Sequence, residues 1–238
     1  MSKTAKIVLG VGLAVALIIG FGVYWVALRD TAEKSASLDA IGGGNAPTTA
    51  AGSSAKTSPD GTWKVSPIAG VFVGYRMEEQ FASATIKKVA TGRTPAVEGT
   101  MTIEGSKVTA VDIKADMTQL KSDEDRRDAQ VRNRGLETAK FGEATFKLTS
   151  PVDLPANLKQ GEEVSITATG DLTLHGATHS VDVPLKAKWN GDTIIAATAG
   201  DGVAITLSDW NIDKIDVAGF VTIDDHGTFE LQLNFIPA

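Results

Sequence analysis

Residues 164–175, VSITATGDLTLH, alternate strictly between apolar or small side chains and polar ones. Val, Ile, Ala, Gly and two Leu occupy one parity, and Ser, Thr, Asp and His occupy the other. Successive side chains of a strand point to opposite faces, whereas a helix would spread these apolar residues around its circumference. The stretch therefore predicts a long strand with one buried face and one exposed face.

The same period of two recurs throughout the chain after residue 61. Longer runs lie at 71–77, 111–117, 181–189, 203–207 and 229–235, and shorter ones at 97–103, 144–148 and 221–223. Turns containing glycine separate several of these runs, and Asn190-Gly191 fits a type I′ hairpin turn best. Many strands joined by short turns predict an antiparallel meander. Closing it into a barrel would leave no exposed edge.

One segment between the strands has a different pattern. Residues 122–135, SDEDRRDAQVRNRG, begin with Ser122 as a potential cap and carry acidic residues in the first turn. Arg132 and Arg134 suit the other end of the dipole, and Gly135 can end the helix. We expect one short helix that lies across an end or a side of the barrel.

The N-terminal region contains an apolar run, and residues 7–28 carry no charge over 22 residues. A helix of that length spans roughly 33 Å, enough to cross a bilayer. Lys3 and Lys6 precede the run, so the positive-inside rule places the N-terminus in the cytoplasm. Residues 1–30 are therefore predicted to be a cytoplasmic stub and a single transmembrane anchor. The rest of the chain would lie on the extracellular or periplasmic side of the cell membrane.

A cleaved signal peptide is the alternative interpretation of this run. Its apolar region would be about 7–15 residues long and would precede a small-x-small cleavage site. The apolar run here is longer, and residues 25–28, WVAL, make a poor site. The uncleaved anchor is therefore the preferred interpretation.

Residues 31–60 differ from both flanking regions in composition. They are rich in Ala, Ser, Thr and Gly, include Pro47 and Pro59, and have no aromatic residue. Such a stretch offers too little apolar surface to offset its ordering entropy. It is predicted to be a flexible linker with a reach of roughly 30 Å. Residues 61–238 remain as a single domain.

The overall composition excludes several classes of function. The net charge of −6 argues against a nucleic-acid partner. With no cysteine there can be no thiol nucleophile, disulfide or cysteine-ligated zinc. No nucleophile elbow, phosphate loop or dinucleotide fingerprint is present. We therefore expect no enzymatic activity and no catalytic residue.

Three histidines could suggest a metal site, since His175 and His179 are close in sequence and His226 is a third candidate ligand. The first two flank a predicted hairpin turn, where a spacing of four residues does not bring side chains together as it would on a helix. We interpret them as turn and surface histidines and predict no metal site.

Four acidic residues in the predicted helix, Asp123, Glu124, Asp125 and Asp128, could supply paired carboxylates for hydrolysis. The simpler interpretation is that these carboxylates complement the helix dipole and pair with neighbouring arginines. A hydrolase would need two of these carboxylates about 5–10 Å apart in a cleft.

The inward faces of the predicted strands are almost wholly apolar. A barrel of about eight strands can be filled by its own side chains or can hold one apolar ligand. Small inward residues such as Ala115, Ala168 and Ala187 favour a cavity over a filled core. By strand parity, the expected ligand-binding residues are Val73, Tyr75, Met77, Ile113, Phe146, Ile166, Leu172 and Phe229.

Several motifs resemble one known family. Trp63-Lys64-Val65 is similar to its opening strand, and residues 73–76 to the partner of that strand. Arg127-Asp128 and the downstream 141–146 resemble its Arg-Asp helix and the strand that follows. Residues 170–179 are similar to its Gly-x-Leu-Thr-Leu-His-Gly-x-Thr hairpin, the most specific of these motifs. Residues 62–238 thus resemble the YceI-like family, the lipocalin-like, polyisoprenoid-binding domain of bacteria.

The resemblance implies an all-β, extended antiparallel lipocalin-like barrel that binds a long isoprenoid chain, such as a polyprenyl lipid or a quinone tail. It implies no enzymatic activity and no cofactor beyond a bound lipid. Many members carry an Asp-x-x-His-Ser motif after the opening Trp, where residues 66–70 here read SPIAG. With the anchor, these features predict a membrane-tethered extracytoplasmic lipid-binding protein. A cell-surface interaction module with a filled barrel is the alternative.

Overall fold

The computed structural model describes residues 32–41, 56–81, 87–213, 216–217 and 221–238. The predicted transmembrane segment 7–28 and residues 42–55 of the predicted linker lie outside this set. Among the helices that the structure describes, none has both the length and the apolar character needed to cross a bilayer.

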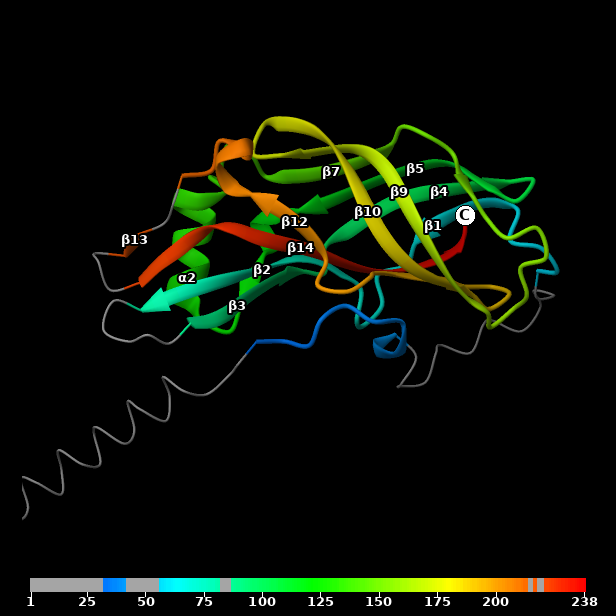
Figure 1. Cartoon of the computed structure of the whole chain (residues 1–238), viewed down its shortest axis with the longest axis horizontal. Helices are drawn as coiled ribbons and strands as arrows, with labels where there is room; N and C mark the ends of the chain where they lie inside the picture. Colours follow the sequence, from blue (N-terminus) through cyan, green and yellow to red (C-terminus); the bar gives the residue numbers. More distant parts are fainter. Residues whose placement is uncertain (1–31, 42–55, 82–86, 214–215, 218–220) are drawn as a thin grey trace, which may run out of the picture. The chain divides into compact units, whose positions relative to one another are not determined.

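Within the described residues, eight antiparallel strands close into a ring, because the last strand, β14, pairs with β1 as well as with β11 (Figure 1). In ring order the strands are β1 Gly61–Val65, β4 Val97–Glu104, β5 Lys107–Asp116, β7 Glu143–Leu148, β9 Glu163–Leu174, β10 Ala177–Trp189, β11 Ile194–Thr198 and β14 Val221–Pro237. The prediction of an all-β barrel of about eight strands is confirmed.

The sheet extends beyond the ring because β14 has 17 residues, whereas β1 and β11, its partners in the ring, have five each. Beyond β1 it pairs with β2, and beyond β11 it pairs with β12 and β13. The additional strands are β2 Phe72–Phe81, β3 Lys87–Thr94, β6 Lys121–Ser122, β8 Val152–Asp153, β12 Val203–Thr206 and β13 Asp216–Val217.

The partner predicted for the opening strand is wrong. Trp63 of β1 faces Met101 of β4 on one side and Pro237 of β14 on the other. Tyr75 of β2 instead faces Phe229 of β14. β1 and β2 both pair with the same edge of β14, at different positions along it. The strands therefore lie one after the other and not side by side.

No type I′ turn forms at Asn190-Gly191, where the sequence predicted one. Asn190 does not adopt a positive φ, and its N–H donates to the carbonyl of Thr193 at 2.8 Å to close a longer loop. The indole of Trp189 donates to the Gly191 carbonyl at 2.7 Å and so holds this loop folded back. Turns with positive φ at both central residues occur at Gly105 (55°) and Ser106 (64°) and at His175 (50°) and Gly176 (76°).

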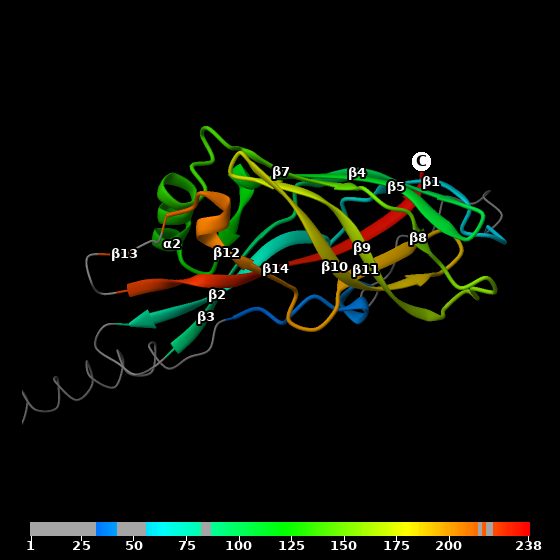
Figure 2. The same ribbon diagram turned by 45° about the horizontal axis from the view of Figure 1, so that its top comes forward.

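The predicted helix forms as α2, Asp125–Gln130, and continues into a π turn, η3 Val131–Gly135. It lies at the end of the barrel where β2 and β12 run (Figure 2). Ser122 is not its cap, because the Glu124 carboxylate accepts the Arg126 N–H at the first turn. The remaining short turns are the 3₁₀ helices η1 Leu38–Ala40, η2 Met117–Gln119 and η4 Leu207–Trp210.

Two of the longer strands, β3 and β11, were not predicted from alternating residues. β3 contains Gly92 and other small residues in place of a regular apolar series. β11 is buried along its whole length, so both of its faces are apolar. Its outer face is covered because η1 packs on β10 and β11.

Residues 32–41, hereafter the N-terminal strap, depart from the flexible linker predicted for this region. Leu38 and Ile41 are only 8% and 5% exposed. The Ala36 N–H donates to Glu230 Oε2 at 3.0 Å, so the strap is bound to the outside of β14. Composition could not reveal this contact, because the two residues are 194 positions apart.

Candidate functional site: an apolar lumen

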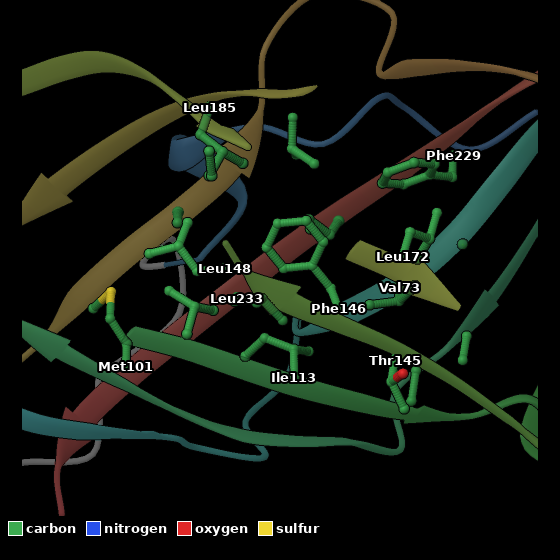
Figure 3. A pocket seen from close by; sticks show the side chains of 18 of the residues that line it. Val73, Met101, Ile113, Thr145, Phe146, Leu148, Leu172, Leu185, Phe229 and Leu233 are labelled. Atoms are coloured by element: carbon green, nitrogen blue, oxygen red, sulfur yellow. The ribbon is translucent and has the colours of Figure 1, made fainter. Parts of the chain in front are cut away.

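The inward faces of the strands enclose a cavity of about 220 Å³. One water molecule needs only about 10–15 Å³, so the interior is far from filled. The described lining residues are aliphatic, aromatic, methionine, glycine or proline, apart from Thr145 and Lys188. Figure 3 shows side chains from several strands, among them Phe146 and Phe229, pointing toward the shared space. Such a wall suits an apolar molecule.

Strand parity predicted the wall correctly at the positions we chose. The structure places all eight predicted residues along the cavity: Val73, Tyr75, Met77, Ile113, Phe146, Ile166, Leu172 and Phe229. They share one face of their strands, and closing the sheet turns that face inward. Their contact with a ligand stays a prediction.

Parity did not find several lining residues that lie outside the strands. These lie in loops, where no period of two exists, and include Leu136, Leu154, Leu158 and Ile212. Their only signal in the sequence is isolated apolar character within a polar segment. The tertiary fold brings them to the lumen.

Glycines opposite aromatic rings give the cavity its shape. A Cβ at Gly92 would lie 2.4 Å from Cε1 of Tyr75, its cross-strand partner. A Cβ at Gly170 would lie 2.4 Å from Cζ of Phe146. Each ring therefore lies over a neighbouring strand at a place where only hydrogen fits.

An ion pair between Glu79 and Arg127 joins β2 to α2. Glu79 is 5% exposed, and its two carboxylate oxygens accept hydrogen bonds from Arg127 Nε at 2.7 Å and Nη2 at 3.0 Å. Burial alone would lower the pKa of Arg127, but its hydrogen bonds with Glu79 and Asp123 raise it above its ordinary value. The charged guanidinium thus attaches α2 to β2.

Tyr75 lines the cavity and lies close to this ion pair. Burial raises the pKa of its phenol, and the nearby Arg127 charge opposes that rise only in part. The phenol is therefore neutral at physiological pH and can donate a hydrogen bond.

The acidic cluster of α2 has local structural partners. Asp123 pairs with Arg127, and Asp128 Oδ1 accepts both the N–H and the hydroxyl of Ser122 at 2.7 Å. Glu124 caps the helix. These contacts match the dipole and pairing role expected from the sequence.

Two histidines fasten the β9–β10 hairpin to η4. His175 Nδ1 lies 3.1 Å from the carbonyl of Trp210, and its Nε2 lies 3.0 Å from Glu137 Oε2. His179 Nε2 lies 2.9 Å from the carbonyl of Asp209. The surface position predicted for His175 is wrong, since it is 7% exposed and packs edge-on against Phe141. Over the described part of the chain, no three His, Asp or Glu side chains gather closely enough to hold a metal ion.

Comparison with known sequences identifies this architecture. The family model of the YceI-like domain matches residues 63–235. The chain belongs to the YceI-like family. The matched residues include the strands that enclose the apolar lumen.

Solved structures share this YceI-like fold. A polyisoprenoid binding domain from Saccharophagus degradans, implicated in plant cell wall breakdown, is 17% identical with a TM-score of 0.57. The match covers 74% of this chain and 98% of that one. BcnA of Burkholderia cenocepacia is also 17% identical, with a TM-score of 0.53 and coverages of 73% and 99%. At this identity the likeness concerns the fold.

Among curated sequences, a UPF0312 protein of Vibrio parahaemolyticus is 30% identical over 120 residues. The match covers 49% of this YceI-like chain and 60% of the relative, and a UPF0312 protein of Vibrio campbellii matches to the same extent. The chain thus spans about three fifths of the length of the curated relatives that it matches.

Proposed function

We propose that this protein is a membrane-tethered, extracytoplasmic binding protein for a long-chain isoprenoid lipid. The observation that carries the proposal is the apolar cavity of about 220 Å³ inside the barrel. Membership of the YceI-like family and the polyisoprenoid binding described for the Saccharophagus protein support this class of ligand. The uncharged segment 7–28, preceded by Lys3 and Lys6, supports the tether and its orientation.

Binding would depend on burial alone. A polyprenyl chain or a quinone tail gains roughly 0.8 kcal/mol for each CH₂ transferred from water to the lumen. Lumen residues such as Ile113, Leu172 and Phe229 supply that environment, and no group has to ionise or react. Tyr75 offers a neutral hydrogen-bond donor to a polar group on the ligand.

Native mass spectrometry with organic extraction tests the proposal on the full chain purified in detergent from its native host. We expect a long-chain isoprenoid in near one-to-one amount. Ala168, on the lumen face of β9, and exposed Thr167, on its outer face, offer a matched pair of variants. Ala168→Trp should fill the lumen and abolish co-purification, whereas Thr167→Trp should retain the lipid.

A contrary result has a clear meaning. If the wild-type protein yields no extractable lipid, even after incubation with quinones and polyprenols, the proposed lipid-binding function is overturned. The alternative would then be a surface interaction module whose barrel needs no ligand. Equal lipid retention in the Ala168→Trp and Thr167→Trp variants would place the lipid outside the lumen.

A further inference from the structure

The N-terminal strap lies outside the family match at 63–235, yet it is built into the barrel surface. In Figure 1 it is the blue segment running along the outside of the sheet. Leu38 and Ile41 are buried and belong to the same apolar cluster as Ile195 and Ala197 of β11. The strap thus supplies the apolar cover for a strand whose outer face would otherwise meet water.

Polar side chains on the outside of the sheet bind the strap through its backbone. Glu230 and Gln232 of β14 are each 1% exposed although they point away from the lumen. Gln232 Oε1 accepts the Ser37 N–H at 2.8 Å, and its amide nitrogen donates to the Gly70 carbonyl at 2.6 Å. Removing such contacts from buried polar groups is costly. This face of the sheet is therefore suited to being covered.

Charge reinforces the contact at the beginning of the strap. Arg93 Nη2 donates to Glu230 Oε1 at 2.7 Å, and its Nη1 pairs with the carboxylate of Glu33. Arg76 Nη1 donates to the Glu33 carbonyl at 2.7 Å. One guanidinium thus bridges a carboxylate of the sheet and a carboxylate of the strap by charge-assisted hydrogen bonds.

The strap begins very close in sequence to the predicted anchor. The apolar segment ends at Leu28 and the described strap begins at Ala32, and four residues can span at most about 14 Å. If the strap leaves the sheet, the next described residue is Lys56, whose carbonyl accepts Gln160 Nε2 at 3.0 Å. The stretch from Leu28 to Lys56, about 28 residues, can span up to about 100 Å.

We propose that the strap is a latch that sets the working distance between the membrane and the barrel. Docked, it leaves only residues 29–31 of the chain between the predicted anchor and the barrel surface. Released, it lets the loaded barrel reach an acceptor several nanometres away. This inference rests on the membrane tether of the proposed function, and adds to it a control over reach.

Docking can be measured directly on the full chain in proteoliposomes, because the natural protein has no cysteine. A single cysteine at Leu38 should react with a maleimide at least about tenfold more slowly than one at exposed Asp39, because docking protects it. Ile41→Asp should raise the rate at position 38 to that at position 39. Ala40→Asp, the same charge on an exposed neighbour, should leave it unchanged.

Reach is measured by energy transfer from a donor on a single cysteine at Val89, on β3, to acceptor lipids in the bilayer. Ile41→Asp should lower the transfer, and Ala40→Asp should not. The proposal is overturned if positions 38 and 39 label equally fast in the wild-type background. It is also overturned if Ile41→Asp exposes position 38 while energy transfer stays constant.

Carbonate extraction separates failure of this inference from failure of the tether. Protein that stays in the membrane retains the anchor, and the labelling and transfer results then decide the latch. Protein released by carbonate has no anchor, which overturns both the tether and the latch even if position 38 stays protected.

Discussion

At the scale of single residues, the shape of the lumen depends on positions where no side chain fits. Gly170 lies against the ring of Phe146, and Gly92 lies against the ring of Tyr75. In each pair a large aromatic side chain uses the space left by a missing Cβ on the adjacent strand. The size of the cavity is therefore set by glycines as much as by the apolar wall.

Replacing Gly170 should disturb both stability and binding. In Gly170→Val, the new Cβ would lie 2.4 Å from both Cζ of Phe146 and the carbonyl oxygen of Lys147, so the ring and the adjoining strand β7 would have to shift. We expect a loss of about 1–3 kcal/mol in the free energy of unfolding, measured by urea denaturation, together with loss of co-purifying lipid. Ser165→Val, on the exposed face of the same strand, is the control. Normal stability and lipid content in Gly170→Val would contradict this account of the cavity.

Tyr75 predicts a specific dependence of stability on alkaline pH. Because burial raises the pKa of its phenol, the folded state retains a proton that the unfolded state loses. The contribution of the Tyr75 phenol to the free energy of unfolding is therefore complete below the pKa of about 10 that it has in the unfolded chain. This contribution falls as the pH rises above that value. Between about pH 9 and 11, the urea midpoint of Tyr75→Phe should therefore fall less steeply than that of the wild type. Parallel curves would show that Tyr75 is not buried as described.

At the scale of elements, a largely buried ion pair attaches α2 to β2, and Asp128 of α2 also accepts hydrogen bonds from Ser122 of β6. Arg127 of α2 binds both carboxylate oxygens of Glu79 on β2, and the two side chains are 17% and 6% exposed. The helix itself has few buried residues. Its position at the end of the barrel therefore depends on this pair more than on apolar packing.

Removing one partner of this pair should cost more than removing both. Arg127→Met leaves Glu79 buried without its counter-ion, and we expect a loss on the order of 3–5 kcal/mol in unfolding free energy. Combining Glu79→Met with Arg127→Met should recover most of the loss, because no unpaired charge stays buried. Chemical denaturation of the two single variants and the double variant forms the test. A double variant as unstable as the sum of the singles would rule out this coupling.

At the scale of the whole molecule, one long strand organises the fold. β14 closes the eight-strand ring with β1 and β11, and then continues to pair with β2 and β12. Its inward residues line the lumen, and its outward residues bind the strap. One face of β14 thus lines the cavity, and its opposite face binds the N-terminal strap.

This arrangement predicts that the strap can be removed without loss of the ligand site. Deleting residues 1–41 uncovers Glu230 and Gln232, so the unfolding free energy should fall by about 1–3 kcal/mol relative to a deletion of 1–31. Both truncated proteins should still take up the lipid in a binding assay. Loss of lipid uptake only in the longer deletion would mean that the strap is part of the binding site.

The sequence by itself determined the local periodicity and, through it, the inward face of each alternating strand. Alternation in 164–175 and its counterparts predicted the strands, and parity placed residues such as Ile166 and Phe229 on the wall of the cavity. These predictions succeed because a strand turns successive side chains to opposite faces regardless of its partners. The Asn-Gly prediction failed because Trp189 is buried in the lumen wall, and its indole holds the carbonyl of Gly191, two residues further along the chain.

Only the tertiary structure decided the pairing of β1 with β4, the burial of His175 and the docking of the strap. Each depends on residues far apart in the chain, such as Arg93 and Glu230, separated by 137 positions. Composition marked the strap as linker because its own apolar residues, Leu38 and Ile41, are too few to fold alone. They become ordered here because a closed sheet offers them an apolar surface and matching hydrogen-bond partners, which no local pattern can encode.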